Sequence, residues 1–226
     1  MTAALNKRHG LEIKRGKVIR LMKRLKLKSK QRQKYKVTTN SKHNNAIADN
    51  HLDQDFNPQK MNQHWAGDIT YLRTRQGWLY LAVVIDLYSR RVVGYAMSER
   101  INQKLVMTAL QQAITLRKPP RGEIIFHSDR GSQYSSKAFQ KLLKKNSFWS
   151  SMSGKGACWD NAVVERFFGS LKNEWLLNVI HLTKLGMRKD VAEYIKYYNY
   201  KRLHSTLGYE TPADYENCTK KVSTKS

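Results

Sequence analysis

Three acidic residues stand in three differently patterned segments of this chain, and the order of those segments restricts the folds it can adopt. Asp68 begins the apolar, β-branched stretch DITYLRT, Asp129 follows the similar stretch IIFHS, and Glu165 lies in a segment with helical periodicity. Sixty residues separate the first pair and thirty-five separate the second. A fold that uses all three must bring two strand ends and one helix to the same place.

The patterning around these acids predicts three strands, a helix, a strand, a helix, a strand and a final helix. We expect strands at 68–74, 78–87, 91–98, 123–127 and 147–153, and helices at 102–117, 135–145 and 160–176. The first three strands are consecutive and are expected to be antiparallel. This order is typical of an α/β, ribonuclease-H-like fold, a mixed five-stranded sheet with flanking helices. In that fold the three acids can converge at one edge of the sheet.

The last of these helices can be tested by angle. Its apolar residues follow one stripe, made of Val164, Phe167, Phe168, Leu171 and Trp175. At 100° per residue, a second sector of about 80° holds Asn161, Glu165, Gly169 and Lys172. Glu174 lies about 180° from Glu165, and Asp160 is expected to be the N-cap. Glu165 is therefore the acid of this helix that we expect to join the other two.

Carboxylates gathered in this way suit hard divalent cations, because Mg²⁺ takes oxygen ligands from one or two carboxylates and from substrate phosphates. We expect two ions, Mg²⁺ or Mn²⁺, with Asp68 bridging both and with Asp129 and Glu165 each holding one. Each acid also has an ordinary structural explanation. Asp68 can be a strand-entry residue, Asp129 a turn residue before Arg-Gly, and Glu165 a solvated helix position.

The charge of the chain indicates a polyanionic partner. Among 226 residues, 42 are Lys or Arg and 17 are Asp or Glu, which gives a formal net charge of +25. Such a surplus favours nucleic acid, since Lys and Arg neutralise phosphates and release condensed counterions; ribosomal RNA or an acidic membrane surface is the simpler alternative. The most apolar run, residues 78–85, is too short to span a bilayer. The two cysteines are far apart, which argues against a zinc site and favours a reduced, cytoplasmic setting. The N-terminus has no apolar h-region, so we expect no signal peptide.

The N-terminal 36 residues are densely basic. Apolar residues from Val18 to Leu27 recur at helical spacing and predict one amphipathic helix, whose basic positions include the expected DNA contacts Arg20, Lys23 and Arg24. This segment is either a solvated arm or one helix of a partial helix-turn-helix. We expect a polar linker at 37–59, a catalytic core with a C-terminal helical extension at 60–218, and a basic tail at 219–226.

Several further residues are candidates for DNA contact. Lys172 and Asn161 share the side of Glu165, although they can equally be solvated polar positions. Lys155 and Trp159, in the glycine-containing loop before the last helix, can pair with phosphate and stack on a base, although Trp159 can equally fill the core. Asp86 is expected to stabilise a turn, and His127 to support the acids from behind.

In the C-terminal segment, Tyr194, Tyr197 and Tyr198 have helical spacing and are expected in the core. Asn199, Arg202 and His204 are expected to form an exposed polar turn, and Thr211-Pro212 to begin a last short helix.

Five strings in order carry a resemblance to a known family. They are WAGDITYL, VVIDLYSRRVVGYAM, HSDRGSQYSS, SMSGKGACWDNAVVERFFGSLKNE and YYNYKRLHSTLGYETPADYE, between about residues 49 and 216. They resemble the second-frame (OrfB-type) transposases of bacterial insertion sequences, which have retroviral-integrase-like catalytic cores. The resemblance implies that Asp68, Asp129 and Glu165 are the metal-binding catalytic acids. It assigns Arg202 and His204 to a motif of the family, and we count them as candidate DNA contacts.

The resemblance also implies partners. Family members cut a transposon end to free a 3′-hydroxyl and use it directly as the nucleophile in strand transfer, so DNA ends, target DNA and a homo-multimer are expected. Many depend on fusion with an upstream-frame helix-turn-helix protein, and most have a longer N-terminal region than the one present here. The alternatives are a truncated, non-transposing DNA-binding inhibitor and, more distantly, a Holliday-junction nuclease.

Overall fold

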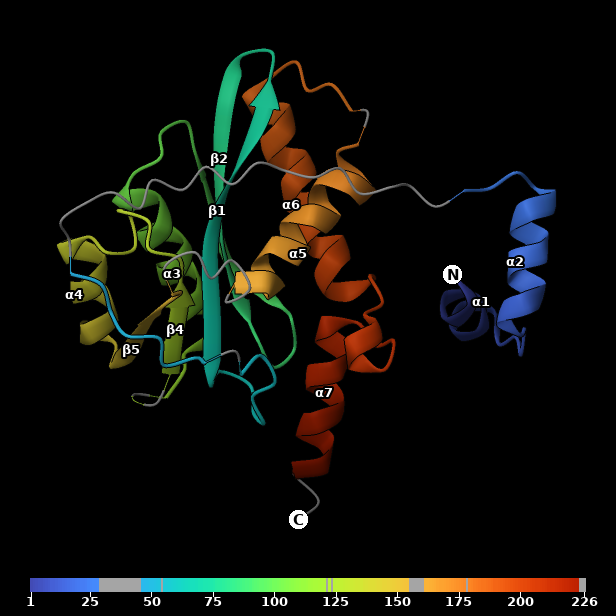
Figure 1. Cartoon of the computed structure of the whole chain (residues 1–226), viewed down its shortest axis with the longest axis horizontal. Helices are drawn as coiled ribbons and strands as arrows, with labels where there is room; N and C mark the ends of the chain where they lie inside the picture. Colours follow the sequence, from blue (N-terminus) through green and yellow to red (C-terminus); the bar gives the residue numbers. More distant parts are fainter. Residues whose placement is uncertain are drawn as a thin grey trace.

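The computed structural model describes residues 1–28, 46–53, 55–120, 122, 124–154, 161–177 and 179–223, with side chains placed as far as residue 218. At its centre lies a five-stranded sheet of order β3-β2-β1-β4-β5 (Figure 1). The strands are β1 (His64–Thr74), β2 (Gly77–Asp86), β3 (Val92–Ser98), β4 (Ile124–Ser128) and β5 (Phe148–Met152). β1 to β3 form an antiparallel meander, and β4 and β5 run parallel to β1. The expected mixed five-stranded sheet is confirmed.

Strand β1 begins four residues earlier than the sequence pattern predicts. Residues 64–66 pair in parallel with Ile125, Phe126 and His127 of β4, and Trp65 is fully buried. Asp68 therefore lies within the strand, opposite Val83 of β2, so its expected position at the strand entry was wrong. The parallel pairing that extends the strand joins segments about sixty residues apart, and local patterning carries no signal of it.

Helices cover both faces of the sheet (Figure 1). Helices α3 (Gln103–Arg117) and α4 (Lys137–Lys145) pack on one face, and α5 (Ala162–Ser170) and α6 (Lys184–Tyr200) pack on the other. Strand β2 is continuously apolar from Leu81 to Ile85 because its alternate residues enter different cores: Leu81 and Val83 join the α5–α6 side, whereas Ala82 and Val84 join the α3–α4 side.

Gly94 of β3 is required by the packing of α3. A Cβ atom at this position would lie 2.2 Å from the carbonyl oxygen of Ala109, which is backbone and cannot move aside. The glycine therefore lets α3 approach the sheet closely.

The predicted apolar stripe on the last core helix is confirmed, since Val164, Phe167, Phe168 and Leu171 are buried and Trp175 packs against the same core. The helix is not α-helical over its whole length, however. After α5 its hydrogen-bond pattern changes to that of a π-helical turn, η2 (Leu171–Trp175), in which the Leu176 amide donates to the Leu171 carbonyl at 3.0 Å. Such π-turns inside helices often occur at functional sites. The N-cap of α5 is Asn161, so the prediction that Asp160 caps this helix was wrong by one residue; Asp160 itself lies outside the described residues.

The N-terminal segment contains two helices, α1 (Thr2–His9) and α2 (Arg15–Arg24), where the sequence predicted one. The Asn6 side chain holds the turn between them, because its Oδ1 accepts from the Ile13 amide and its Nδ2 donates to the Ile13 carbonyl. Val18 is buried, but Ile19 and Leu25 are exposed. The predicted apolar stripe is thus only partly covered. Residues 29–36 lie outside the described part of the chain.

The C-terminal extension packs as the sequence predicts at several points. Tyr194 and Tyr198 are buried and Tyr197 is partly buried in the same core. A short 3₁₀ turn, η3 (Ser205–Leu207), precedes α7 (Pro212–Ser223), and Thr211 caps α7 by accepting from the Asp214 amide at 3.1 Å. No helix in the described ranges is both long and apolar enough to cross a bilayer.

Candidate active site

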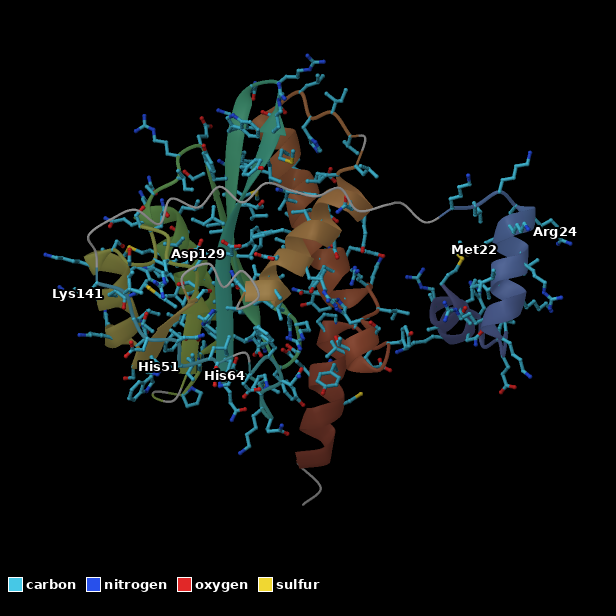
Figure 2. The ribbon with its side chains drawn as sticks, viewed as in Figure 1. Met22, Arg24, His51, His64, Asp129 and Lys141 are labelled. Atoms are coloured by element: carbon cyan, nitrogen blue, oxygen red, sulfur yellow. The ribbon has the colours of Figure 1, made fainter. Side chains whose placement is uncertain are left out.

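Two of the predicted acids lie side by side because their strands are parallel neighbours. Ala66 of β1 pairs with His127 of β4, so two residues further on Asp68 of β1 stands next to Asp129, the first residue after β4. Asp68 Oδ1 accepts from the Ile69 amide at 2.7 Å, and Asp129 Oδ1 accepts from the Gly131 amide at 3.0 Å. The strand register itself therefore brings these two carboxylates together. Figure 2 shows Asp129 beside the middle of β1.

The pKa of Asp68 is raised well above its usual value, first by burial, then by the like charge of Asp129 and, to a lesser extent, by Glu165. The Ile69 amide and the Lys172 ammonium oppose this shift without cancelling it. A buried carboxylate surrounded by like charges is destabilised in its ionised form unless a cation compensates it.

Glu165 reaches this region from the first turn of α5 and remains exposed; partial burial raises the pKa of its carboxyl group. The start of α5 is tied to β1 by the buried Asn161, whose Nδ2 donates to the Gly67 carbonyl at 3.4 Å. Asn161 Oδ1 is buried without a hydrogen-bond partner in the described structure. The structure therefore brings Asn161 and Glu165 to the strand that carries Asp68.

The acids and Asn161 do not form a closed coordination shell. Among the described residues, no three Asp, Glu, His or Cys side chains are grouped closely enough to surround one ion. The three acids interact electrostatically, and oxygen ligands from a substrate and from water remain necessary to complete the sphere of a divalent cation such as Mg²⁺. Oxygen-only, mutually repelling donors fit Mg²⁺ or Mn²⁺ better than a soft metal.

Lys172 is the cation that approaches the acids. It comes from the π-helical turn, its charge acts on Asp68, and its Nζ lies 4.5 Å from the centre of the Tyr71 ring. Burial lowers the pKa of Lys172 to about 8, and Asp68 opposes that shift. The sequence predicted that Lys172 and Glu165 share one side of the helix, and the charges of both act on Asp68.

A pocket of about 620 Å³ opens at Asp68 and Asp129 and is bounded by aromatic side chains of β1 and β2, namely Tyr71, Trp78 and Tyr80, together with Tyr134. Sequence reasoning missed all four. Tyr134 is fully buried, and its pKa is raised well above the usual value by burial and by the charges of Asp68 and Asp129. Its position five residues after Asp129 was visible in the sequence, but only the fold turns its ring toward the acids.

Two residues expected near the acids have other roles. His127 is buried and its ring nitrogens contact Ser151 Oγ at 2.9 Å and Ser153 Oγ at 3.1 Å, which ties β4 to β5. Asp86 stabilises the β2–β3 turn, as predicted, because its carboxylate accepts from the amides of Tyr88 and Asn62 at 2.9 Å. It lies at the C-terminal end of β2, three residues beyond Val83, which is opposite Asp68, and it is beside Arg117 rather than with the acids.

The predicted exposed turn is wrong for Asn199, which is buried, while Arg202 and His204 are half-buried. Asn199 exchanges two hydrogen bonds with the Val92 backbone, at 3.0 and 2.9 Å, and so extends the pairing of edge strand β3. Arg202 forms a two-pronged ion pair with Glu174, with both contacts at 2.7 Å. Burial, with Arg202 nearby, lowers the pKa of His204 to about 4.

The remaining candidate DNA contacts fall into two groups. Arg20, Lys23 and Arg24 are exposed on α2, and Figure 2 shows Arg24 projecting away from α1. Lys155 and Trp159 lie outside the described residues.

Comparisons with known proteins agree with this geometry. Two family models described as integrase core domain match residues 58–158 and 148–212. The transposase InsF for insertion sequence IS3A of Escherichia coli (strain K12) is 46% identical over 197 residues, which cover 87% of this chain and 68% of the relative. The chain belongs to the integrase-core transposases of insertion sequences. It is therefore a transposase, an enzyme of the polynucleotidyl-transferase class.

Other similar proteins fit this membership. An insertion element IS600 uncharacterized 31 kDa protein of Shigella sonnei is 43% identical over 206 residues, which cover 91% of this chain and 75% of that protein. The HTLV-2 integrase catalytic core domain in complex with magnesium is 22% identical, with a TM-score of 0.53, and covers 68% of this chain and 95% of its own. The BIV integrase catalytic core domain is 17% identical, with a TM-score of 0.52, and covers 72% and 99%. These structures confirm the ribonuclease-H-like fold of the transposase core. The alternative of a non-transposing DNA-binding protein is not favoured.

Proposed function

We propose that Asp68, Asp129 and Glu165 are the catalytic acids of this transposase and hold two divalent metal ions, Mg²⁺ or Mn²⁺. The single observation that carries the proposal is the crowding of carboxylates around Asp68, whose pKa is raised by burial and by Asp129 and Glu165. Such crowding disfavours the ionised carboxylates, and a bound divalent cation relieves it. Bound there, the ions would ionise the attacking oxygen and stabilise the leaving oxygen of an in-line displacement.

The reaction we propose has two steps on DNA. In cleavage, a water oxygen bonds to the phosphorus at the transposon end, and the 3′-oxygen of the transposon strand leaves as a hydroxyl group. In strand transfer, that 3′-oxygen bonds to a target phosphorus while the 3′-oxygen of the target strand leaves. No bond to the protein forms in either step.

The chain's own side chains hold the DNA for these steps. Lys172 lies beside Asp68 and would pair with a phosphate next to the reacting one, while Asn161 fixes the start of α5 against β1. The aromatic wall of Tyr71, Trp78 and Tyr80 offers flat faces on which an unpaired base can stack. Arg20, Lys23 and Arg24 on exposed α2 would contact the backbone of the transposon end.

We also propose that the transposase acts on chromosomal and element DNA in the bacterial cytoplasm as a homo-multimer, because two ends must be paired before both are joined. An upstream-frame helix-turn-helix protein would supply end-specific binding. A simian T-cell lymphotropic virus intasome is an assembled complex with a similar core. It is 20% identical to this chain, with a TM-score of 0.57, and the match covers 74% of this chain and 56% of that chain.

The test is cleavage and joining of labelled DNA that carries the flanking element ends, with Mg²⁺ or Mn²⁺, beside a Glu165→Gln variant. We expect metal-dependent nicking and joining by the transposase and loss of both in the variant, with DNA binding retained. Glu193→Gln, at an exposed position of α6, is the matched control and should react normally. Loss of DNA binding in Glu165→Gln would contradict the assignment. An inactive but DNA-binding wild type, also with the upstream-frame protein added, would support the non-transposing binder instead.

A further inference from the structure

A second pocket, of about 290 Å³, lies against α5 on a different side of that helix from the acids. Three arginines line it: Arg90 from the turn between β2 and β3, Arg166 from α5, and Arg202 from the residues after α6. On α5, Arg166 follows Glu165 directly and so points about 100° away from it around the helix axis. The acid site and the arginine pocket thus occupy adjacent sides of one helix.

Arg90 has an unused donor inside this pocket. Its Nη2 donates to Asn57 Oδ1 at 2.8 Å, whereas its Nη1 is buried and has no hydrogen-bond partner in the described structure. A buried charged donor without a partner is costly, and such groups in native proteins call for a ligand. Arg90 also has a φ of 61°, a left-handed conformation that is uncommon for a residue with a side chain. Strained backbone of this kind often occurs at ligand clamps.

The pocket holds more positive charge than the acids near its arginines neutralise. Glu174 pairs with Arg202 and holds its guanidinium group in place through two 2.7 Å contacts. Asp86 attracts Arg90, but the Asp86 carboxylate already accepts from two backbone amides. Arg166 is exposed and forms no hydrogen bond or ion pair with any residue that the structure describes. Arg90 and Arg166 repel each other, which indicates a place for an anion between them.

We propose that Arg90, Arg166 and Arg202 bind one backbone phosphate of DNA, about three nucleotides from the phosphodiester that reacts at Asp68, Asp129 and Glu165. The spacing follows because a helix with side chains is about 10–12 Å across, and one strand of duplex DNA carries a phosphate every ~3.4 Å of its axis. A strand that crosses α5 from the acids to the pocket spans about three of these repeats. The position relative to a reacting phosphodiester rests on the proposed function; the phosphate-binding pocket does not.

The first test measures DNA binding without chemistry, in Ca²⁺, on a 30-base-pair duplex with one element end, as a function of salt. Arg166→Gln should weaken binding about tenfold and lower the slope of log affinity against log salt by about 0.9. Arg90→Gln should do the same, and the double variant should lose one phosphate contact, not two. Lys141→Gln removes the same charge from an exposed position of α4, which Figure 2 shows on the side of the molecule away from α5, and should leave the slope unchanged.

The second test replaces single phosphates of the transferred strand by neutral methylphosphonates. We expect the wild type to lose about tenfold in affinity at one position about three nucleotides from the joining site. The Arg166→Gln variant should not be sensitive there. Because Arg166 is exposed, this variant should fold, and its melting temperature checks that it does. The pocket assignment stands or falls on these binding data, whether or not the Glu165→Gln reaction test succeeds.

Three outcomes would overturn the proposal. Equal sensitivity of wild type and both arginine variants at every phosphate would place no phosphate in the pocket. Inorganic phosphate could raise the melting temperature of the wild type but not of Arg90→Gln, while both proteins show the same salt slope for DNA binding. The pocket would then be a site for a free anion. A change of oligomeric state at an unchanged slope would assign the pocket to an acidic side chain of a second copy.

Discussion

Two groups of acids in this transposase have opposite electrostatic surroundings. One is the group of Asp68 and Asp129 at the centre of the sheet, with Glu165 beside it. The other is Glu216 of α7 with Asp86 at the end of β2. Glu216 accepts from Ser89 Oγ at 2.6 Å and Arg91 Nη1 at 2.6 Å, and it also pairs with Arg117.

The pKa values express the difference. Burial by itself raises the pKa of Glu216, but hydrogen bonds and charge from Arg117, together with Ser89 and Arg91, outweigh burial and leave it lowered. Asp68 is partly buried and has acids rather than arginines as its strongest charged neighbours, so its pKa is raised. Burial alone therefore does not mark a functional acid. Incomplete compensation does: the charge of Lys172 opposes the shift of Asp68 without cancelling it, which leaves room for an external cation.

The largest expected effect is on catalysis at the uncompensated group. Asp68→Asn should lower cleavage and joining by about 10³-fold or more, because a charged ligand for the metal ions is lost. Its free energy of unfolding without metal should stay the same or rise, since a buried, repelled carboxylate is removed. Denaturant unfolding beside the reaction assay tests both. A large loss of stability would mean that Asp68 is a structural acid like Glu216.

Glu216→Gln should show the reverse pattern. Removing the acid leaves Arg91 and Arg117 buried without their shared anion, so the free energy of unfolding should fall by about 3–5 kcal/mol. Joining activity per folded molecule should not change. Glu193→Gln on exposed α6 should stay within about 0.5 kcal/mol of the wild type. A Glu216→Gln variant as stable as wild type would show that the ionic cluster does not hold α7 to the sheet.

The compensated group should also show a pH dependence of its own. Burial raises the pKa of Asp86 to about 6 from 3.8, with Arg117 opposing the shift. The folded state therefore binds a proton that the unfolded state has released in this window. The contribution of this proton to the free energy of unfolding is complete below pH 3.8 and is lost as the pH rises through 6. Wild type should lose about 2 kcal/mol relative to Asp86→Asn between pH 4 and 7. Melting of both proteins across this range measures the difference, and parallel curves would refute it.

The smallest effect is expected from the neutral neighbour of the catalytic acids. Tyr134→Phe removes a hydroxyl group near Asp68 and Asp129 while keeping the buried ring that packs on Phe126 and Phe139. One neutral hydrogen-bonding group contributes about 0.5–1.5 kcal/mol, so activity should fall by roughly tenfold or less. A loss as large as that of Asp68→Asn would give Tyr134 a direct role in the reaction.

Much of the core was readable from local patterns. The number and order of strands, the buried face of α5, and the cap of α7 by Thr211 follow from alternation, helical periodicity and capping, which are local properties of the chain. The start of β1 was missed because Trp65 and Ala66 are fixed by pairing with β4. Helix α1 was missed because it buries no residue and so has no apolar stripe to detect. The half-buried position of Arg202 is fixed by its ion pair with Glu174, twenty-eight residues away, and local polarity suggested full exposure instead.

By itself the sequence determined which acids are candidates, that the chain carries a large positive charge, and which family it belongs to, because residue types, charges and motifs are properties of the chain. Only the tertiary structure decided which charges meet. It places Asp68 beside Asp129 through the β1–β4 register, Glu216 among arginines through the docking of α7, and three arginines around one pocket. The reason is physical. The pKa of a carboxylate depends on burial and on neighbours within a few ångströms, and so does whether a hydrogen-bond donor has a partner. Folding brings those neighbours together from distant parts of the chain.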